Sequence, residues 1–330
     1  MTTNRKFSGE FVDFEEVRRK KSHCETIIEV NNKWMVEHSD EYDPIKTMRE
    51  NNNASAEINK LDNILANEPP PPELPPRHPL SKVCGVLEEF TVQKVMGYFT
   101  AREYEPDEFA RLEEQNQIGG LLLAMTGNAA ASSVTSQSRE RKNDACDFVR
   151  GKINGIPFHG WLGQTHVREG DYVEMAVAEQ DGHYVVYAII LPELRTISIT
   201  PRCHCGREAD IKFARGCGLP AIASIFLVML IVFYFKGMGW QGIAVCAAMF
   251  GGALFLAYWR AARSTRKKPG PVIDLAEHIF ATLGFTKPQR VDLRKLTKER
   301  LKILPSEETP INDREMPSRT SSWVDYFYYY

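Results

Sequence analysis

Three neighbouring residues, Cys203, His204 and Cys205, carry the side chains best suited to chemistry, and Cys217 follows further along the chain. Thiolates and an imidazole together can bind zinc or copper(I). A structural zinc site usually adds a second Cys-x-x-Cys or a His-x-x-x-His, which is missing here. The alternative is a polar junction between the last strand and a membrane segment. We therefore expect no metal and no other cofactor, and we keep Cys203, His204 and Cys205 as candidate ligands.

Three histidines could serve acid–base catalysis. His159, His166 and His183 fall in or beside expected strands, with Asp171 and Asp181 nearby. A lone histidine in a sheet is more often a surface or core residue. The sequence has no G-x-S-x-G elbow, phosphate-binding loop, dinucleotide fingerprint or H-E-x-x-H helix. We therefore expect no catalytic residues and no enzyme.

These residues belong to a region of short β-type runs. Turn residues at 169–171 and 181–183 separate some runs, and 172–175 alternates apolar with polar residues. We predict a small antiparallel β-barrel-like module of five to seven strands at 81–202, with a Gly/Ala-rich insertion at 118–136. The runs are VCGVLEEFTV, KVMGYFTA, CDFVRGKI, IPFHGWL, DYVEMAVAE, HYVVYAIIL and RTISITP.

Two long apolar runs, 219–235 and 242–259, follow this module. At ~1.5 Å rise per residue each covers roughly 25 Å, near the short end of what spans a bilayer core. Helices of a globular domain normally carry a polar face, which these runs lack, so we favour a two-helix transmembrane hairpin over a buried pair. The aromatic residues expected at the membrane interface are Tyr234, Phe235, Trp240, Tyr258 and Trp259.

Basic residues flank this hairpin on both sides. By the positive-inside rule they place both termini in the cytoplasm, as in a multi-pass protein of the bacterial inner (plasma) membrane. The expected partners are the lipid bilayer, a protein bound through the β-module or the C-terminal aromatic tail, and a second copy of the chain. The formal net charge of −2 does not point to nucleic acid. The basic residues are Arg215, Arg260, Arg263, Arg266, Lys267 and Lys268.

The remaining segments have distinct compositions. The charged N-terminal extension, 1–66, is expected to be partly helical or disordered. A proline-rich linker follows at 67–80, because locked φ angles and missing donors exclude helix and sheet interior, and the alternative is a proline-motif ligand. The chain then has a juxtamembrane segment (203–218), C-terminal cytoplasmic helices forming a helical cap (260–305), and a polar tail with the aromatic end WVDYFYYY (306–330). That end should dock on its own sheet or on a partner.

Seven cysteines, an odd number, argue for free thiols.

Several motifs in one order resemble a family of bacterial membrane proteins described as type VI secretion system effectors. They are a proline-rich lead-in, VCGVLEEFTV, the Gly/Ala-rich insertion, GWLGQTHVREGDYVEMAVAEQDGHYVVYAI, RTISITPRCHCGREADIKF, the helical hairpin, AEHIFATLGFTKPQRVDL and an aromatic terminus, and they cover residues 69–330. The resemblance implies an α+β membrane protein and supplies no catalytic residues. The first function that it implies is that of an integral inner-membrane protein that perturbs membranes as an effector. The alternative is a resident inner-membrane scaffold, accessory or immunity protein that presents a cytoplasmic β-module to a partner.

Overall fold

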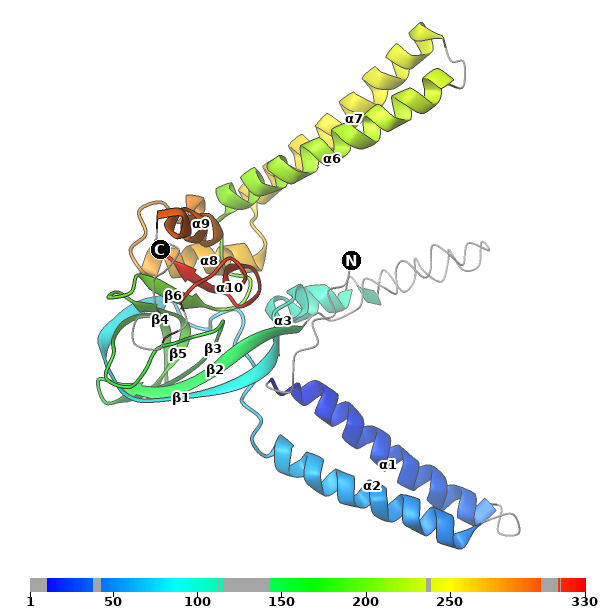
Figure 1. The fold of residues 1–330 in the computed structure, drawn as a ribbon, viewed down its shortest axis with the longest axis vertical. Helices are drawn as coiled ribbons and strands as arrows, with labels where there is room; N and C mark the ends of the chain where they lie inside the picture. The colour runs from blue at the N-terminus through cyan, green and yellow to red at the C-terminus, as the bar shows by residue number, and fades with distance from the viewer. Residues whose placement is uncertain are drawn as a thin grey trace.

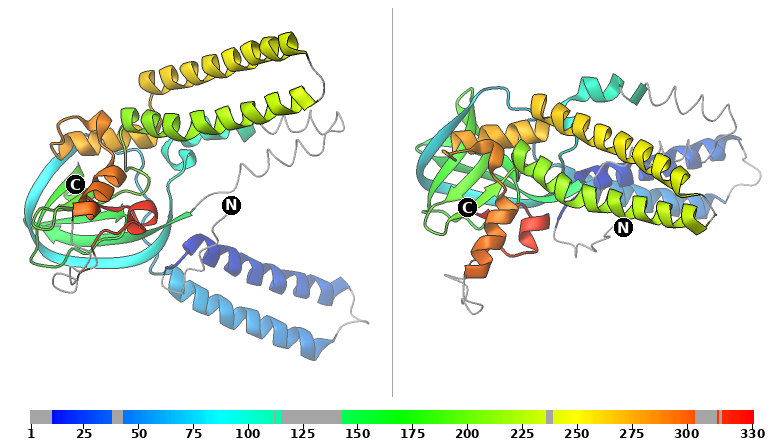
Figure 2. Two further views of the ribbon diagram at one scale, coloured as in Figure 1. Left: turned by 45° about the horizontal axis from the view of Figure 1, so that its top comes forward. Right: turned by 90° about the horizontal axis from the view of Figure 1, so that it is seen from above.

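A seven-stranded sheet forms the centre of the molecule, and two long helical hairpins project from one side of it (Figures 1 and 2). The computed structural model describes residues 11–37, 43–111, 113–114, 143–235, 239–303, 314 and 316–330. The predicted Gly/Ala-rich insertion at 118–136 lies outside these ranges. The strands are β1 (Leu80–Tyr98), β2 (Asn143–Ile153), β3 (Ile156–Leu162), β4 (Tyr172–Gln180), β5 (His183–Leu191), β6 (Thr196–Ile199) and β7 (Phe327–Tyr329).

Five of these strands close into a barrel. The sheet order is β3-β2-β1-β4-β5-β6-β7, and an additional pairing joins β3 to β5. The long strand β1 pairs with β4 through its first half and with β2 through its second, with a register shift between Leu87 and Glu89. The closing pair, β3 with β5, is parallel, whereas all other pairs are antiparallel. This strand order, 1-2-3-5-4-1, is that of an OB-fold barrel.

The barrel interior is filled by apolar side chains at alternate strand positions. Each full burial of a Leu, Ile or Phe side chain contributes about 1.5–3 kcal/mol, so this cluster stabilises the closed form. Gly160 permits the closure, because a Cβ there would lie 2.3 Å from the carbonyl oxygen of Val186 on β5. The interior residues are Leu87, Val149, Ile153, Phe158, Leu162, Val173, Met175, Val177, Val186, Ile189 and Leu191.

The helical cap lies on the outside of β4, β5 and β6. Helix α8 (Pro271–Thr282) starts with proline at its first turn and buries Leu275, Ile279 and Phe280 against the sheet. The helix is followed by Gly284, whose φ of 87° lies in the left-handed region that commonly ends helices. The 3-10 turn η1 (Pro288–Arg290), α9 (Leu293–Ile303) and α10 (Ser321–Val324) complete this layer.

The aromatic end of the chain docks on its own sheet. Strand β7 pairs antiparallel with β6, with Tyr328 opposite Ile197. Tyr326, Phe327, Tyr328 and Tyr329 are all buried. These side chains are therefore part of the protein's own core.

The N-terminal extension forms an antiparallel hairpin of α1 (Phe14–Glu37) and α2 (Pro44–Leu65). Asp43 caps α2 by accepting hydrogen bonds from the backbone of Ile45 and Lys46. At the base of the hairpin, Phe14 and Leu65 pack against Phe99 and Phe148, and the short helix α3 (Ala101–Tyr104) follows β1.

The predicted membrane hairpin is wrong. The apolar runs lie within α6 (Arg207–Phe235) and α7 (Trp240–Lys267), which form an antiparallel pair (Figure 2). Across the described residues, no helix combines the length and the apolar character that crossing a membrane requires. Both helices extend beyond the apolar runs into charged turns, α6 at its start and α7 at its end, and α6 contains Pro220. This finding overturns the expectation of an α+β membrane protein in the bacterial inner membrane, either as a membrane-perturbing effector or as a resident scaffold, accessory or immunity protein.

The expected interface and topology residues have other surroundings. Trp259 is 49% exposed, and the Arg263 guanidinium lies 5.3 Å from its ring centroid. The side chains of Tyr234, Phe235, Trp240 and Tyr258 lie outside the described set. The basic residues Arg215, Arg260, Arg263, Arg266, Lys267 and Lys268 are exposed on α6, on α7 and just beyond it.

Candidate functional site

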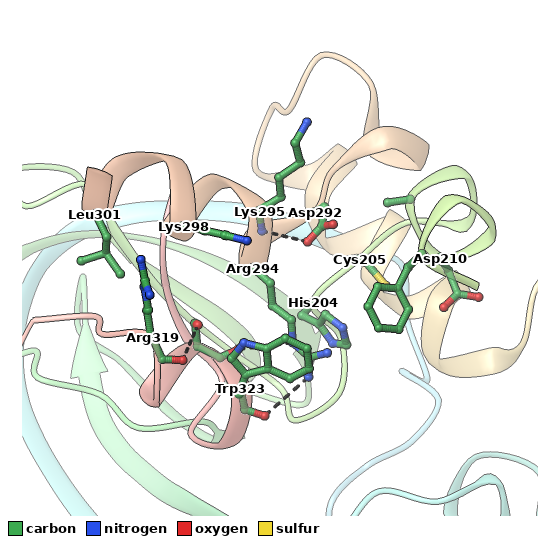
Figure 3. A pocket seen from close by; sticks show the side chains of 13 residues that line it. His204, Cys205, Asp210, Asp292, Arg294, Lys295, Lys298, Leu301, Arg319 and Trp323 are labelled. Carbon is green, nitrogen blue, oxygen red and sulfur yellow. Dashed lines mark hydrogen bonds between the residues drawn. The ribbon is translucent and has the colours of Figure 1, made fainter. Parts of the chain in front are cut away.

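A cavity of about 520 Å³ opens between the first turns of α6, helix α9 and helix α10 (Figure 3). Its size falls in the range of small-molecule sites, which are typically about 300–1,000 Å³. Figure 3 shows Asp210 at one end and Leu301 with Arg319 at the other. The lining residues are His204, Cys205, Ala209, Asp210, Phe213, Asp292, Arg294, Lys295, Lys298, Leu301, Arg319, Ser322 and Trp323.

Helix α9 supplies the basic wall of this cavity. Arg294 and Lys298 are four residues apart, so they share one helical face. Another face is fixed to the sheet, because the Tyr329 backbone N–H donates to Thr297 Oγ1 at 3.0 Å and Leu293 is fully buried. Docking of α9 on β7 therefore sets the direction of the basic face.

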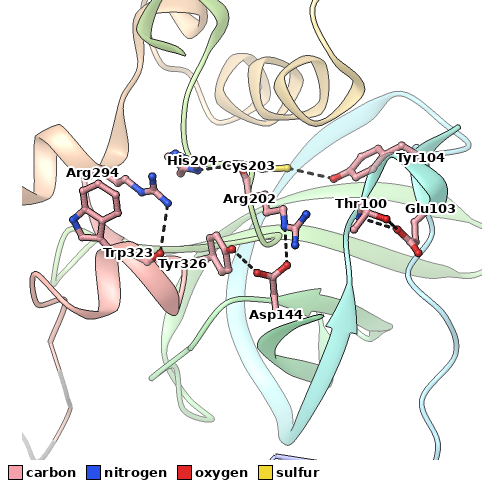
Figure 4. Close-up of polar contacts among 10 residues, drawn as sticks. All are labelled: Thr100, Glu103, Tyr104, Asp144, Arg202, Cys203, His204, Arg294, Trp323 and Tyr326. Atoms are coloured by element: carbon pink, nitrogen blue, oxygen red, sulfur yellow. Dashed lines mark hydrogen bonds and ion pairs between the residues drawn. The ribbon is translucent and has the colours of Figure 1, made fainter. Parts of the chain in front are cut away.

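Arg294 and Trp323 are in direct contact on this wall. The Arg294 guanidinium donates to the carbonyl oxygens of Ser322 at 3.3 Å and Trp323 at 3.5 Å. It also lies 4.5 Å from the centroid of the Trp323 ring, a cation–π contact (Figure 4). These contacts keep a cation and an aromatic surface side by side.

Some charged residues of the cavity have partners within the described part of the chain, and others have no ion pair there. Asp292 accepts a hydrogen bond from the backbone of Lys295 at 3.0 Å, and the Lys295 ammonium pairs with Glu299 at 3.5 Å. Within the described ranges, no acidic side chain forms an ion pair with Lys298 or Arg319. These two cations are therefore available to an anionic ligand.

Burial shifts the pKa values of three cavity residues, His204, Cys205 and Asp210, which we call the inner end of the cavity. Burial, and then the nearby Arg294 charge, lowers the pKa of His204 to about 4. Burial, and then Asp210 and Asp292, raises the pKa of Cys205 to about 12. Burial also raises the pKa of Asp210. At neutral pH this end presents a neutral imidazole and a protonated thiol.

The three candidate metal ligands do not converge. Cys203 lies outside the cavity, with its Sγ 3.6 Å from the Tyr104 hydroxyl, and burial raises its pKa to about 12 (Figure 4). His204 Nδ1 lies 3.0 Å from the carbonyl oxygen of Arg202, whereas Cys205 lines the cavity. Among the described residues, no three His, Cys, Asp or Glu side chains form a group that could hold a metal ion.

A polar network fixes the turn that carries His204 and Cys205. The Arg202 guanidinium binds Asp144 at 2.7 Å, and the Tyr326 hydroxyl donates to the same carboxylate at 2.7 Å (Figure 4). Arg202 takes a φ of 71°, and Thr200 donates to the Tyr187 carbonyl at 3.0 Å. The turn is thus tied to β2, β5 and the C-terminal segment.

The other histidines have separate environments. His159 stacks on His183 with centroids 5.2 Å apart, and burial, followed by the His183 charge, lowers the pKa of His159. His166 packs against Phe327. Asp171 accepts two hydrogen bonds from Arg314 at 2.7 and 2.8 Å, and Asp181 is exposed at the β4–β5 turn.

Sequence reasoning missed the basic and aromatic walls. Lys298 and Arg319 resemble ordinary solvated residues, and Trp323 was grouped with the aromatic tail. The amphipathic pattern of α9 was the only local signal. No local pattern links 204–213 to 292–301, because they meet only in the fold, where the Leu293 backbone N–H donates to the His204 carbonyl oxygen at 3.0 Å and an isolated β-bridge pairs Cys205 with Asp292.

Comparisons with protein-family models, with curated proteins and with solved structures found no match to this chain. The resemblance to type VI secretion system effectors therefore stays a prediction.

Proposed function

We propose that this protein binds a small anionic molecule with an apolar body in the cavity between α6, α9 and α10. The observation that carries the proposal is the placement of Lys298 and Arg319, which have no acidic partner in the described part of the chain, around a cavity walled by Trp323, Phe213 and Leu301. An anion there would form charge-assisted hydrogen bonds, which contribute about 1.5–3 kcal/mol each.

The surroundings favour binding over catalysis. At neutral pH His204 is an uncharged imidazole and Cys205 is a protonated thiol, because burial shifts their pKa to about 4 and about 12. Neither side chain therefore attracts an anion by its charge, and Cys205 does not supply a thiolate nucleophile. Arg294 is already bonded to two carbonyl oxygens, so its role is to position the aromatic wall and add positive potential. The cavity therefore has a half-buried end at His204 and Cys205 and two exposed cations, Lys298 and Arg319, along its lining.

Fluorescence titration with 8-anilinonaphthalene-1-sulfonate tests this proposal, with uncharged N-phenyl-1-naphthylamine as the matched neutral probe. We expect saturable binding of one sulfonate probe per chain. Lys298→Gln combined with Arg319→Gln should weaken sulfonate binding by at least about tenfold, the loss expected from a single charged contact, and leave the neutral probe unchanged.

The control pair is Arg300→Gln with Lys302→Gln, which removes the same charge from exposed positions of α9 that do not line the cavity. Equal weakening by the control pair would mean that general charge attracts the probe. Equal loss of the neutral probe in a folded double variant would mean that Lys298 and Arg319 do not select for the anion. Either result rejects the proposal.

A further inference from the structure

The proline-rich segment is packed on the barrel. We call residues 68–79 the proline strap; it connects α2 to β1 (Figure 1). Pro69 is buried, and Pro72, Glu73, Leu74 and Pro76 are half-buried. The strap therefore follows a surface of the protein, whereas a free linker would be solvated along its length.

Aromatic donors on that surface bind the backbone of the strap. Trp161 Nε1 on β3 donates to the carbonyl oxygen of Pro70 at 2.9 Å. The Tyr187 hydroxyl on β5 donates to the carbonyl oxygen of Glu73, also at 2.9 Å. Prolines have no N–H, and polyproline segments form no internal hydrogen bonds, so their carbonyl oxygens are free to accept such donors.

Apolar contacts accompany these bonds. Leu74 packs against the cluster that contains Phe99 and Phe148, with Trp161 at its edge, and also against the cluster that contains Tyr187. A groove of about 670 Å³ continues beside the strap, lined by Pro69, Pro70, Pro71, Pro72 and Trp161 among others. Aromatic side chains that both contact prolines and donate to their carbonyl groups are the recurrent basis of proline-motif recognition.

We propose that the outer face of β3 and β5 around Trp161 and Tyr187 is a polyproline-binding surface. The proline strap occupies it within the chain, and a proline-rich peptide of another protein with the strap's pattern, P-P-P-P-x-L-P-P, occupies it when the strap is displaced. Two features favour replacement of the strap by such a peptide. Only Pro69 of the strap is buried, and the hydrogen bonds from Trp161 and Tyr187 are made to backbone carbonyl oxygens, which another chain also offers.

The tether gives the strap an advantage over any free peptide. A segment joined by a short connection acts at an effective concentration on the order of millimolar. A free peptide should therefore bind the intact chain weakly and bind a strapless chain well.

Fluorescence anisotropy of a labelled peptide, EPPPPELPPR, tests this inference. The full chain with residues 69–76 replaced by a Gly-Ser segment of equal length should bind the peptide in a saturable way, at least about tenfold tighter than the intact chain. A peptide with glycine in place of every proline should bind neither. Failure of a folded strapless chain to bind, or equal binding of the glycine peptide, would overturn the inference.

A second measurement applies even if the strapless chain fails to fold. Tyr187→Phe keeps the ring and removes only the hydroxyl donor, whereas Trp161→Phe removes the Nε1 donor together with part of the indole ring that packs against Phe99 and Phe148. Together they should speed cleavage within 69–76 of the intact chain by at least about tenfold under limited proteolysis, because each lost hydrogen bond releases about 1 kcal/mol of restraint. Tyr98→Phe is the matched control, since it removes a hydroxyl that donates to Asp13. Unchanged cleavage in the double variant would show that the donors do not hold the strap.

Discussion

Arg207, the first residue of α6, holds Glu277 of α8 from two directions. Its backbone N–H donates to Glu277 Oε1 at 2.8 Å, and its guanidinium Nε donates to the same carboxylate at 2.9 Å. The side chain of Glu277 is only 8% exposed, and that of Arg207 is 28% exposed. Burial would by itself raise the pKa of Glu277, but the hydrogen bonds from Arg207 outweigh it and hold that pKa below its ordinary value.

Glu277→Gln should lower the free energy of unfolding by about 2 kcal/mol, because it removes a charged hydrogen-bond acceptor from a largely buried site. Glu208→Gln is the control, since its pair with Arg290 is exposed and should contribute less than about 1 kcal/mol. The pKa of Glu277 is depressed, so its contribution is present above the ordinary value of 4.5 and is lost as the pH falls through the folded-state pKa. Urea denaturation at pH 7 and pH 4 checks both points; equal effects of the two substitutions would contradict the first.

Gly160→Ala should destabilise the barrel by about 3 kcal/mol, because its Cβ would lie 2.3 Å from the Val186 carbonyl oxygen at the closing pair. Gly252→Ala supplies the control. It is an exposed position of helix α7 with no atom within 4 Å of an added Cβ, so alanine should leave stability unchanged or slightly higher. Thermal and urea unfolding measure both variants. Similar unfolding of Gly160→Ala and the unmodified chain would mean that β3 and β5 are not paired.

His204 should titrate with a midpoint near pH 4, as its folded-state pKa of about 4 lies below the ordinary value of 6.5. Between these values the unfolded chain binds more protons, so stability rises with pH. The contribution of this residue should fall by about 2 kcal/mol between pH 7 and pH 5. His204→Gln should not lose this part of its stability as the pH falls. The measurement is the difference between the unfolding free energies of the unmodified chain and of His204→Gln at each pH. A His204 resonance, identified by its absence in His204→Gln, that titrates near 6.5 in the folded protein would rule this out.

Local patterns predicted the strands and several helices but not how they close on one another. The alternation at 172–175 lies in β4, and Gly284 ends the last turn after α8, because both depend on neighbouring residues. The contact of Gly160 with Val186 is set by closure across the barrel, which no local pattern encodes.

The apolar runs at 219–235 and 242–259 predict helices, which the structure confirms, but not membrane spans. Hydropathy of a run does not show where its helix begins and ends, and α6 and α7 extend to Arg207 and Lys267. In the site, His204 and Cys205 were found by residue type. Lys298 and Arg319 were not, because a cation at a cavity and a cation in solvent have the same sequence signature.

The two ends of the α6–α7 hairpin meet. The Arg207 guanidinium donates to the carbonyl oxygen of Arg266 at 3.4 Å, so the chain leaves and rejoins the cap at nearly one point. When the two ends of an inserted segment lie together, the length of the segment has little effect on the stability of the rest of the protein, because the entropic cost of closing a loop grows slowly with its length. Whole helical turns can therefore be gained or lost in both arms together without disturbing the barrel. The length of the α6–α7 hairpin can therefore change while its junction with the cap, at Arg207 and Arg266, stays the same.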